Sequence, residues 1–117
     1  MNYEMKENTP VIQAVDAVID NPSAAMDLLA TVHYEVGCNQ MILHKGCLSE
    51  DFFRLSTGLA GEILQKFANY RMRLVIVGDF SGYTSKPLQD FIRESNHGRM
   101  IGFCQSDEEA LVWLSRR

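Results

Sequence analysis

The stretch Arg73-Leu74-Val75-Ile76-Val77-Gly78-Asp79 decides the fold of this chain. It holds four consecutive apolar residues, three of them β-branched, between a charged residue and a glycine. An uninterrupted run of this kind is typical of a parallel strand that is covered on both faces. We therefore predict an α/β domain in which residues 74–77 form a central strand and Asp79 lies just past its carboxyl end.

Strands and helices alternate on both sides of this run. Residues 41–43 are a short apolar strand that ends at His44, and residues 57–70 carry an apolar stripe at helical spacing. After the central strand come a helix over residues 86–95, a strand over residues 100–104, and a last helix with Ser106 and Glu109 as its capping box. The order β-α-β-α-β-α with right-handed crossovers predicts a parallel sheet with helices on its faces.

The first forty residues add a strand pair and a helix. Residues 3–6 and 11–15 flank a turn at residues 8–10. Asn21-Pro22 predicts a helix start, and Gly37 a left-handed helix end. No linker or repeat interrupts the 117 residues, so we predict one α/β domain, residues 1–117, with the order β-β-α-β-α-β-α-β-α and a mixed, mostly parallel sheet.

Composition disfavours several classes of function. The chain has 11 Lys and Arg against 15 Asp and Glu, a net charge of -4, and no basic stripe, which disfavours nucleic acid and an anionic membrane surface as partners. No apolar run reaches the roughly 18 residues of a membrane span. Cys38, Cys47 and Cys104 show no C-x-x-C spacing, and we interpret them as reduced thiols of a cytoplasmic protein.

The candidate site follows from the sheet. Ligands of open α/β sheets bind outside the carboxyl ends of the strands, where we expect His44, Asp79 and the group Ser56-Thr57-Gly58 to collect. A helix start at Thr57 would favour a phosphate or carboxylate, and a hydroxyl there could be phosphorylated. The alternatives are structural: Ser56 or Thr57 as a helix cap, Asp79 as a loop cap and His44 as a hydrogen-bonded core histidine. Gly58 and Gly61 suggest close approach of a backbone or ligand.

Other residues offer weaker signals. Tyr83, beside Phe80, is the kind of aromatic anchor that protein interfaces use, and Asp51 lies near the same expected surface. Arg71, Arg73 and Lys86 could rim an anion or partner site near Tyr83, or could be solvated. Phe52 and Phe53 are either core or interface residues. Cys47 follows His44 closely enough to suggest a thiol nucleophile, but no spacing indicates a metal site.

Several of these motifs carry a resemblance. Met41-Ile42-Leu43-His44, Asp51-Phe52-Phe53, residues 57–67, Ile76-Val77-Gly78-Asp79-Phe80 and Tyr83-Thr84-Ser85 resemble the bacterial domain-of-unknown-function family 4180. The resemblance covers residues 41–114 well and the first forty loosely, and it implies no established activity. Ser56-Thr57-Gly58-Leu59 and Asp107-Glu108-Glu109-Ala110-Leu111 more distantly resemble STAS (sulphate transporter and anti-sigma factor antagonist) domains. That likeness implies the same element order and a phosphorylated hydroxyl at residues 56–57, although Leu55 stands where those domains carry an aspartate.

These observations predict a small regulatory or protein-interaction module that binds an unidentified protein partner. Its recognition surface would comprise Ser56, Thr57, Gly58, Asp79, His44, Asp51 and Tyr83, with a phospho-switch near Thr57. No catalytic residue, cofactor or metal ligand is predicted. The alternative is a small-ligand binder or enzyme that uses a pocket formed by His44, Asp79 and Thr57. A further alternative is a homodimer that buries Phe52, Phe53 or Trp113.

Overall fold

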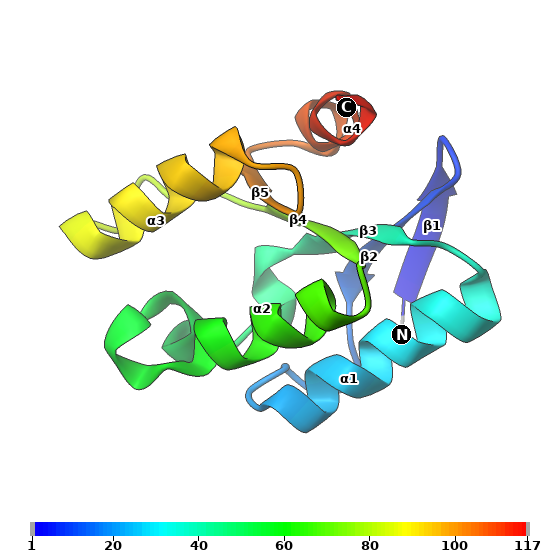
Figure 1. Ribbon diagram of the computed structural model, residues 1–117, viewed down its shortest axis with the longest axis horizontal. Helices are drawn as coiled ribbons and strands as arrows, with labels where there is room; N and C mark the ends of the chain where they lie inside the picture. Colours follow the sequence, from blue (N-terminus) through cyan, green and yellow to red (C-terminus); the bar gives the residue numbers. More distant parts are fainter. Residues whose placement is uncertain (1, 117) are drawn as a thin grey trace.

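The computed structural model describes residues 2–116, which form one five-stranded sheet with helices on both faces (Figure 1). The strands are β1 (Asn2–Lys6), β2 (Thr9–Ala14), β3 (Gln40–His44), β4 (Arg73–Val77) and β5 (Ile101–Cys104). The helices are α1 (Pro22–Ala30), which continues into a π-helical segment (Thr31–Val36), α2 (Leu59–Asn69), α3 (Lys86–His97) and α4 (Asp107–Ser115). Three 3-10 turns connect β3 with α2: Lys45–Cys47, Glu50–Phe53 and Leu55–Thr57. The predicted α/β class and element order are confirmed.

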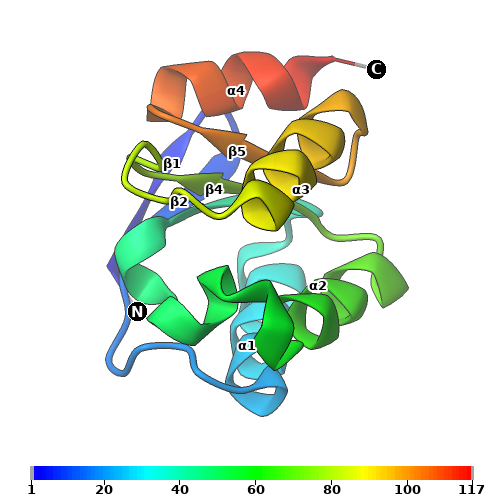
Figure 2. The same ribbon diagram turned by 90° about the vertical axis from the view of Figure 1, so that its left-hand side faces the viewer.

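The strands lie in the sheet in the order in which they occur in the chain. β1 is antiparallel to β2, and all other neighbours are parallel. Right-handed crossovers that always step in the same direction place their helices on one face of a sheet. Figure 2 shows this arrangement, with α1, α2 and α3 on one side and α4 alone on the other. The sheet therefore has a carboxyl edge, where β2 to β5 end, and an amino edge, where these strands begin.

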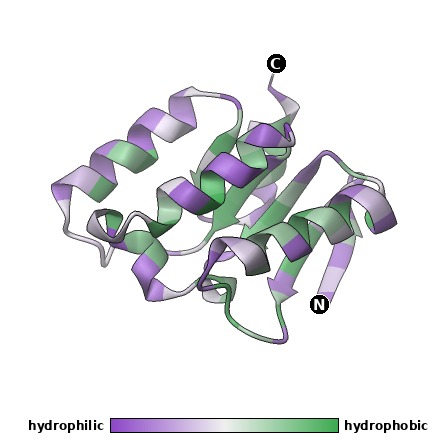
Figure 3. Ribbon diagram, turned by 60° about the horizontal axis from the view of Figure 1, so that its bottom comes forward, coloured by the Kyte–Doolittle hydropathy of each residue, from purple (hydrophilic) through white to green (hydrophobic). Residues whose placement is uncertain are grey.

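The central strand packs on both faces, as its apolar run predicts. Leu74 and Ile76 belong to the larger core beneath α1, α2 and α3, whereas Val75 and Val77 face α4. Figure 3 shows the hydrophobic strands between helices of mixed hydropathy. Burial of each such side chain stabilises the fold by roughly 1.5–3 kcal/mol. Gly102 on β5 leaves room for the Trp113 ring, because a Cβ there would lie 2.9 Å from it.

The capping signals place three helix ends correctly. The Ala24 N–H donates to Asn21 Oδ1 at 2.8 Å at the start of α1, and the Glu109 N–H donates to Ser106 Oγ at 3.1 Å at the start of α4. Gly37 ends the π-helical segment with a φ of 78°. These positions confirm that local side-chain chemistry defines where the helices begin and end.

The predicted start of α2 at Thr57 is wrong. Residues 55–57 form a separate 3-10 turn, and Gly58 then adopts a φ of 78° before the helix begins at Leu59. A left-handed residue interrupts a right-handed helix, which is why the turn and the helix do not merge. The expected close approach of another backbone at the glycines is also wrong, since a Cβ at Gly58 or Gly61 would meet nothing within 4 Å. Gly58 is required for its backbone conformation, and nothing in the structure explains Gly61.

The aromatic pair after Asp51 belongs to the core. Phe52 and Phe53 are 1% and 3% exposed, and Trp113 is 6% exposed. The core interpretation is confirmed, because the chain itself buries these three side chains. Within residues 2–116, none of the helices combines the length and apolar character needed to cross a membrane.

Candidate functional site

His44 ends β3 at the carboxyl edge, and its side chain faces α4. Its Nε2 lies 2.8 Å from Oδ1 of Asp107, the first residue of α4, and Lys6 Nζ donates to the other carboxylate oxygen at 3.2 Å. The Asp107 side chain is only 12% exposed. His44 is therefore part of an ion cluster that ties β1, β3 and α4 together.

The charge of Asp107 is stabilised by this cluster. Partial burial raises the pKa of Asp107, but the hydrogen bonds and electrostatic attraction from His44 and Lys6 outweigh burial and leave the pKa below its ordinary value. The Asp107 carboxylate also lies at a helix N-terminus, where negative charge is favoured. The cluster thus holds a carboxylate in its ionised form.

Asp79 follows β4 at the same edge. Its Oδ1 accepts a hydrogen bond from the Ser81 N–H at 2.9 Å, which closes the turn after the strand. Hydrogen bonding from Ser81 lowers the pKa of Asp79, and the positive charge of Lys45 acts in the same direction. In this structure Asp79 caps its own loop, as Asp does in many turns.

The two hydroxyls at residues 56–57 differ in their surroundings. Thr57 Oγ1 lies 2.8 Å from the carbonyl oxygen of Asp51 and 2.9 Å from that of Arg54, and it accepts from the Leu59 N–H at 3.2 Å. The Thr57 hydroxyl therefore joins the 3-10 turns to the start of α2. Ser56 is exposed.

A groove of about 510 Å³ opens at the carboxyl edge between the 3-10 turns and the loop that leads into α3. We call it the edge groove. Glu50, Phe53, Arg54, Leu55 and Ser56 line one side, and Tyr83, Thr84, Ser85, Pro87 and Leu88 line the other. Of the candidate residues from the sequence, the groove brings together Ser56 and Tyr83. His44, Asp79, Thr57, Gly58 and Asp51 are not among the residues that line it.

Tyr83 is braced on three sides. Its ring stacks on Phe53 with a centroid separation of 5.1 Å, and Lys45 Nζ lies 4.7 Å from the ring centre on a cation–π contact. Its hydroxyl donates to Glu50 Oε2 at 2.9 Å. Burial raises the pKa of Tyr83, and the bond to Glu50 adds to this, while Lys45 opposes it. The hydroxyl stays protonated at neutral pH, so the aromatic wall of the groove is uncharged and held in place.

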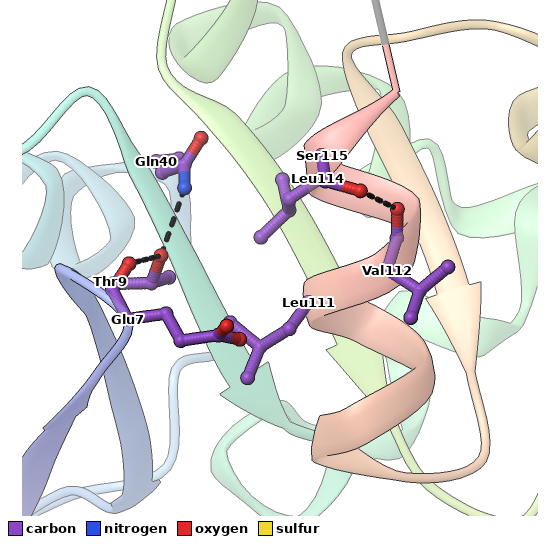
Figure 4. A pocket seen from close by; sticks show the side chains of 7 residues that line it. All are labelled: Glu7, Thr9, Gln40, Leu111, Val112, Leu114 and Ser115. Carbon is purple, nitrogen blue, oxygen red and sulfur yellow. Dashed lines mark hydrogen bonds between the residues drawn. The ribbon is translucent and has the colours of Figure 1, made fainter.

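A second hollow, of about 330 Å³, lies between the β1–β2 hairpin and α4 (Figure 4). Its amide and hydroxyl side chains bond within the chain, since Gln40 Nε2 donates to Thr9 Oγ1 at 2.8 Å and the Ser115 hydroxyl donates to the Val112 carbonyl at 2.6 Å. Glu7, Leu111, Val112 and Leu114 supply the rest of the lining that Figure 4 shows. Its hydroxyl and amide groups have little spare capacity for a ligand.

The positions of Arg73 and Cys47 in the structure correct two further hypotheses from the sequence. Arg73 begins β4 at the amino edge, a full strand away from the loop that holds Tyr83, so it cannot rim a site there. Cys47 is buried, its Sγ lies 3.8 Å from the Ile12 carbonyl oxygen, and burial raises the pKa of its thiol. A raised pKa lowers the thiolate fraction and so weakens Cys47 as a nucleophile.

The sequence reasoning missed Asp107, Lys6, Lys45 and Glu50, which bind the candidate residues. The signal for Asp107 was present, because the capping box at Ser106 places it in the first turn of α4. Without the strand order, however, nothing brought that turn next to His44. Within residues 2–116, no group of three or more His, Cys, Asp or Glu side chains is arranged to hold a metal ion.

Comparisons with known proteins give one family. Neither the curated proteins nor the solved structures contain a match, so the STAS resemblance stays a prediction. A family model described as a domain of unknown function, DUF4180, matches residues 4–114, which extends the likeness through β1, β2 and α1. Because the model covers nearly the whole chain, the protein belongs to the DUF4180 family.

Proposed function

We propose that this chain is a protein-interaction module that binds a segment of a partner protein in the edge groove. The observation that carries the proposal is the groove itself, about 510 Å³ between two loops at the carboxyl edge, where ligands of open α/β sheets bind. Loops on a rigid sheet are the usual location of binding residues.

The chemistry of the groove fits a peptide segment. Leu55 offers apolar contact, Tyr83 is a fixed aromatic anchor, and the hydroxyls of Ser56 and Thr84 can bond a partner's backbone. Glu50 and Arg54 supply one charge of each sign at its rim. A braced tyrosine costs little conformational entropy on binding, which favours its use as an anchor.

The alternative function, an enzyme or small-ligand binder, requires His44, Asp79 and Thr57 in one pocket. His44 bonds Asp107 toward α4, Asp79 bonds the Ser81 backbone and the Thr57 hydroxyl bonds backbone carbonyl groups. Each of these groups already has an internal partner, so this alternative has less support than the interaction module.

Within the same proposal, Ser56 is the better candidate for a phospho-switch. Its exposed side chain lines the groove beside Arg54, so a phosphate there would add a dianion to the binding surface without removing a structural bond. Phosphorylation of Thr57 would instead remove the hydrogen that its hydroxyl donates toward the carbonyl groups of Asp51 and Arg54.

Site-specific photo-crosslinking tests the proposal. A photoreactive residue in place of Thr84 should crosslink in cells to one defined protein, and the crosslink should weaken at least severalfold when Tyr83→Ala removes the anchor. The same group in place of Gln65, an exposed residue of α2 that does not line the groove, is the matched control. Equal crosslinking from positions 84 and 65, or no effect of Tyr83→Ala, would contradict the proposal.

A thermal-shift screen against metabolites separates the two functions. A small molecule whose stabilising effect is lost in His44→Gln and in Asp79→Asn would support the alternative function. The interaction module predicts no compound with that dependence.

A further inference from the structure

The amino edge of the sheet holds a hollow of about 200 Å³ that the proposed function does not use. The arginine hollow, as we call it, is lined by Arg73, His97, Gly98, Arg99, Trp113 and Arg116. These residues come from the start of β4, the turn between α3 and β5, and the end of α4. Three guanidinium groups therefore converge on one concave site of a chain whose net charge is -4.

Arg73 is fixed at this site by two hydrogen bonds to backbone carbonyl groups. Its Nε donates to the Arg99 carbonyl at 2.7 Å, and its Nη1 donates to the Leu114 carbonyl at 2.8 Å. Its Nη2 is buried and has no hydrogen-bond partner among residues 2–116. A covered atom is out of reach of a ligand in the hollow, so Arg73 contributes its positive charge to the site, and the exposed guanidinium groups of Arg99 and Arg116 are the ones that can contact a ligand.

The positive charges at the site are not balanced by carboxylates within residues 2–116. Among residues 2–116, no carboxylate forms an ion pair with Arg73, Arg99 or Arg116. Burial lowers the pKa of Arg73, and the neighbouring charges of Arg116 and Arg99 lower it further. Like charges held this close repel one another, and an anion between them would relieve the repulsion.

Trp113 contacts Arg73 and Arg116, and Asn96 contacts Arg116, so two of the three arginines are held in position. The guanidinium carbons of Arg73 and Arg116 each lie 5.3 Å from the Trp113 ring centre. The Asn96 carbonyl accepts hydrogen bonds from Trp113 Nε1 and from Arg116 Nη2, both at 3.1 Å. The site is thus organised before any ligand arrives, which reduces the entropy cost of binding.

We propose that the arginine hollow binds a phosphate group, either as free phosphate or at the end of a larger molecule. The N–H groups of a guanidinium match the oxygen geometry of phosphate, and a phosphate dianion neutralises more of the three positive charges than a monovalent carboxylate does. The volume is below the roughly 300–1,000 Å³ of pockets for drug-sized ligands, which suits one tetrahedral group rather than a whole nucleotide.

Trp113 provides the test, because it is the one tryptophan of the sequence and two of the arginines contact its ring. The intact protein is titrated at constant ionic strength with inorganic phosphate, with O-phosphoserine and with acetate while Trp113 fluorescence is followed. We expect a saturable change with phosphate and a much weaker response to acetate. Tighter binding of O-phosphoserine would assign the phosphate to a larger molecule, and equal or weaker binding would assign free phosphate.

Matched variants locate the binding site. Arg99→Gln and Arg116→Gln each remove one exposed guanidinium, and each should weaken phosphate binding about tenfold, the effect expected when one charge-assisted contact is lost. Arg93→Gln removes the same charge from α3, where it pairs with Asp90, and should leave phosphate affinity unchanged. The proposal is overturned if phosphate causes no saturable change in Trp113 fluorescence or if acetate binds as tightly as phosphate. It is also overturned if Arg99→Gln and Arg116→Gln both keep the wild-type affinity for phosphate.

Discussion

The polar side chains at the two edges of the sheet differ in whether they have partners within the described chain. At the carboxyl edge, His44 bonds Asp107, Asp79 bonds the Ser81 backbone, and the Thr57 hydroxyl bonds carbonyl groups. At the amino edge, Arg73 and Arg116 lie near each other with no carboxylate partner among residues 2–116, and Arg73 Nη2 is buried without an acceptor.

This difference shows that a side chain can lie where ligands usually bind and still be unavailable, because it already has a partner within the protein. The rule that ligands bind at the carboxyl ends of strands led us to an edge that has a groove, yet most titratable groups there already have partners. Within the part of the chain that the structure describes, Arg73, Arg99 and Arg116 at the opposite edge have no carboxylate partner. We therefore expect recognition at the edge groove to depend mainly on contact with the Tyr83 ring and recognition at the arginine hollow to depend mainly on charge.

The largest effect should come from Asn96, which supports the amino edge. Its side-chain Oδ1 accepts from the Phe103 N–H at 2.6 Å, and its Nδ2 donates to the Phe103 carbonyl at 3.0 Å. It thus occupies the free side of the edge strand β5. Asn96→Ala leaves two backbone groups unpaired and should lower the free energy of unfolding by about 2–3 kcal/mol, as measured by urea denaturation.

Asn96→Asp is the matched control. It keeps an acceptor for the Phe103 N–H but replaces the donor by an oxygen that repels the Phe103 carbonyl, so it should lose stability relative to the wild type and less than Asn96→Ala does. If the two variants are equally stable, the hydrogen bond from the Phe103 N–H to Asn96 does not stabilise the edge strand β5.

The next effect concerns the ion cluster at the carboxyl edge. Asp107→Asn removes the charge that His44 and Lys6 bind and should cost about 1.5 kcal/mol at neutral pH. The pKa of Asp107 is lowered in the folded protein, so its charge stabilises the fold above the ordinary Asp pKa of about 3.9. That contribution is lost as the pH falls through the lower folded value.

Urea denaturation of both proteins at several pH values checks this sign. The advantage of the wild type over Asp107→Asn should shrink as the pH falls below about 3.9 and disappear in stronger acid. An advantage that grows toward acid pH would show that the carboxylate is not stabilised by the cluster.

The sequence predicted most of the fold for physical reasons that are local. The apolar run at residues 74–77, the caps at Asn21 and Ser106 and the left-handed end at Gly37 each depend on a few neighbouring residues. The strand order, in contrast, depends on which strands pair across the whole chain. No local pattern determines that pairing, so the meeting of His44 with Asp107 could not be predicted.

The site was predicted less well for the same reason. Ser56 and Tyr83 were identified because hydroxyl and aromatic residues in loops are ordinary binding residues. Arg73, Arg99 and Arg116 stand far apart in the sequence and show no shared spacing. Only the packing of α4 on β4 and β5 brings the three guanidinium groups to one hollow.

A smaller effect is expected at Thr57. Thr57→Val keeps the size of the side chain but removes the hydroxyl that links residues 51–54 to the start of α2, so the free energy of unfolding should fall by about 1 kcal/mol. Thr57→Ser keeps the hydroxyl and should be close to wild type. If Thr57→Val unfolds at the wild-type urea concentration, the hydroxyl does not stabilise this junction and Thr57 becomes available for modification.

The smallest effect on stability is expected at Tyr83, where the ring and the hydroxyl can be tested separately. Tyr83→Phe removes the bond to Glu50 but keeps the ring between Phe53 and Lys45, so stability should change by less than about 0.5 kcal/mol because the bond is exposed. Partner crosslinking from Thr84 should also persist, since the aromatic surface remains. Loss of crosslinking in Tyr83→Phe would mean that the partner binds the Tyr83 hydroxyl. Recognition at the carboxyl edge would then depend on a polar group, and its contrast with recognition at the arginine hollow would disappear.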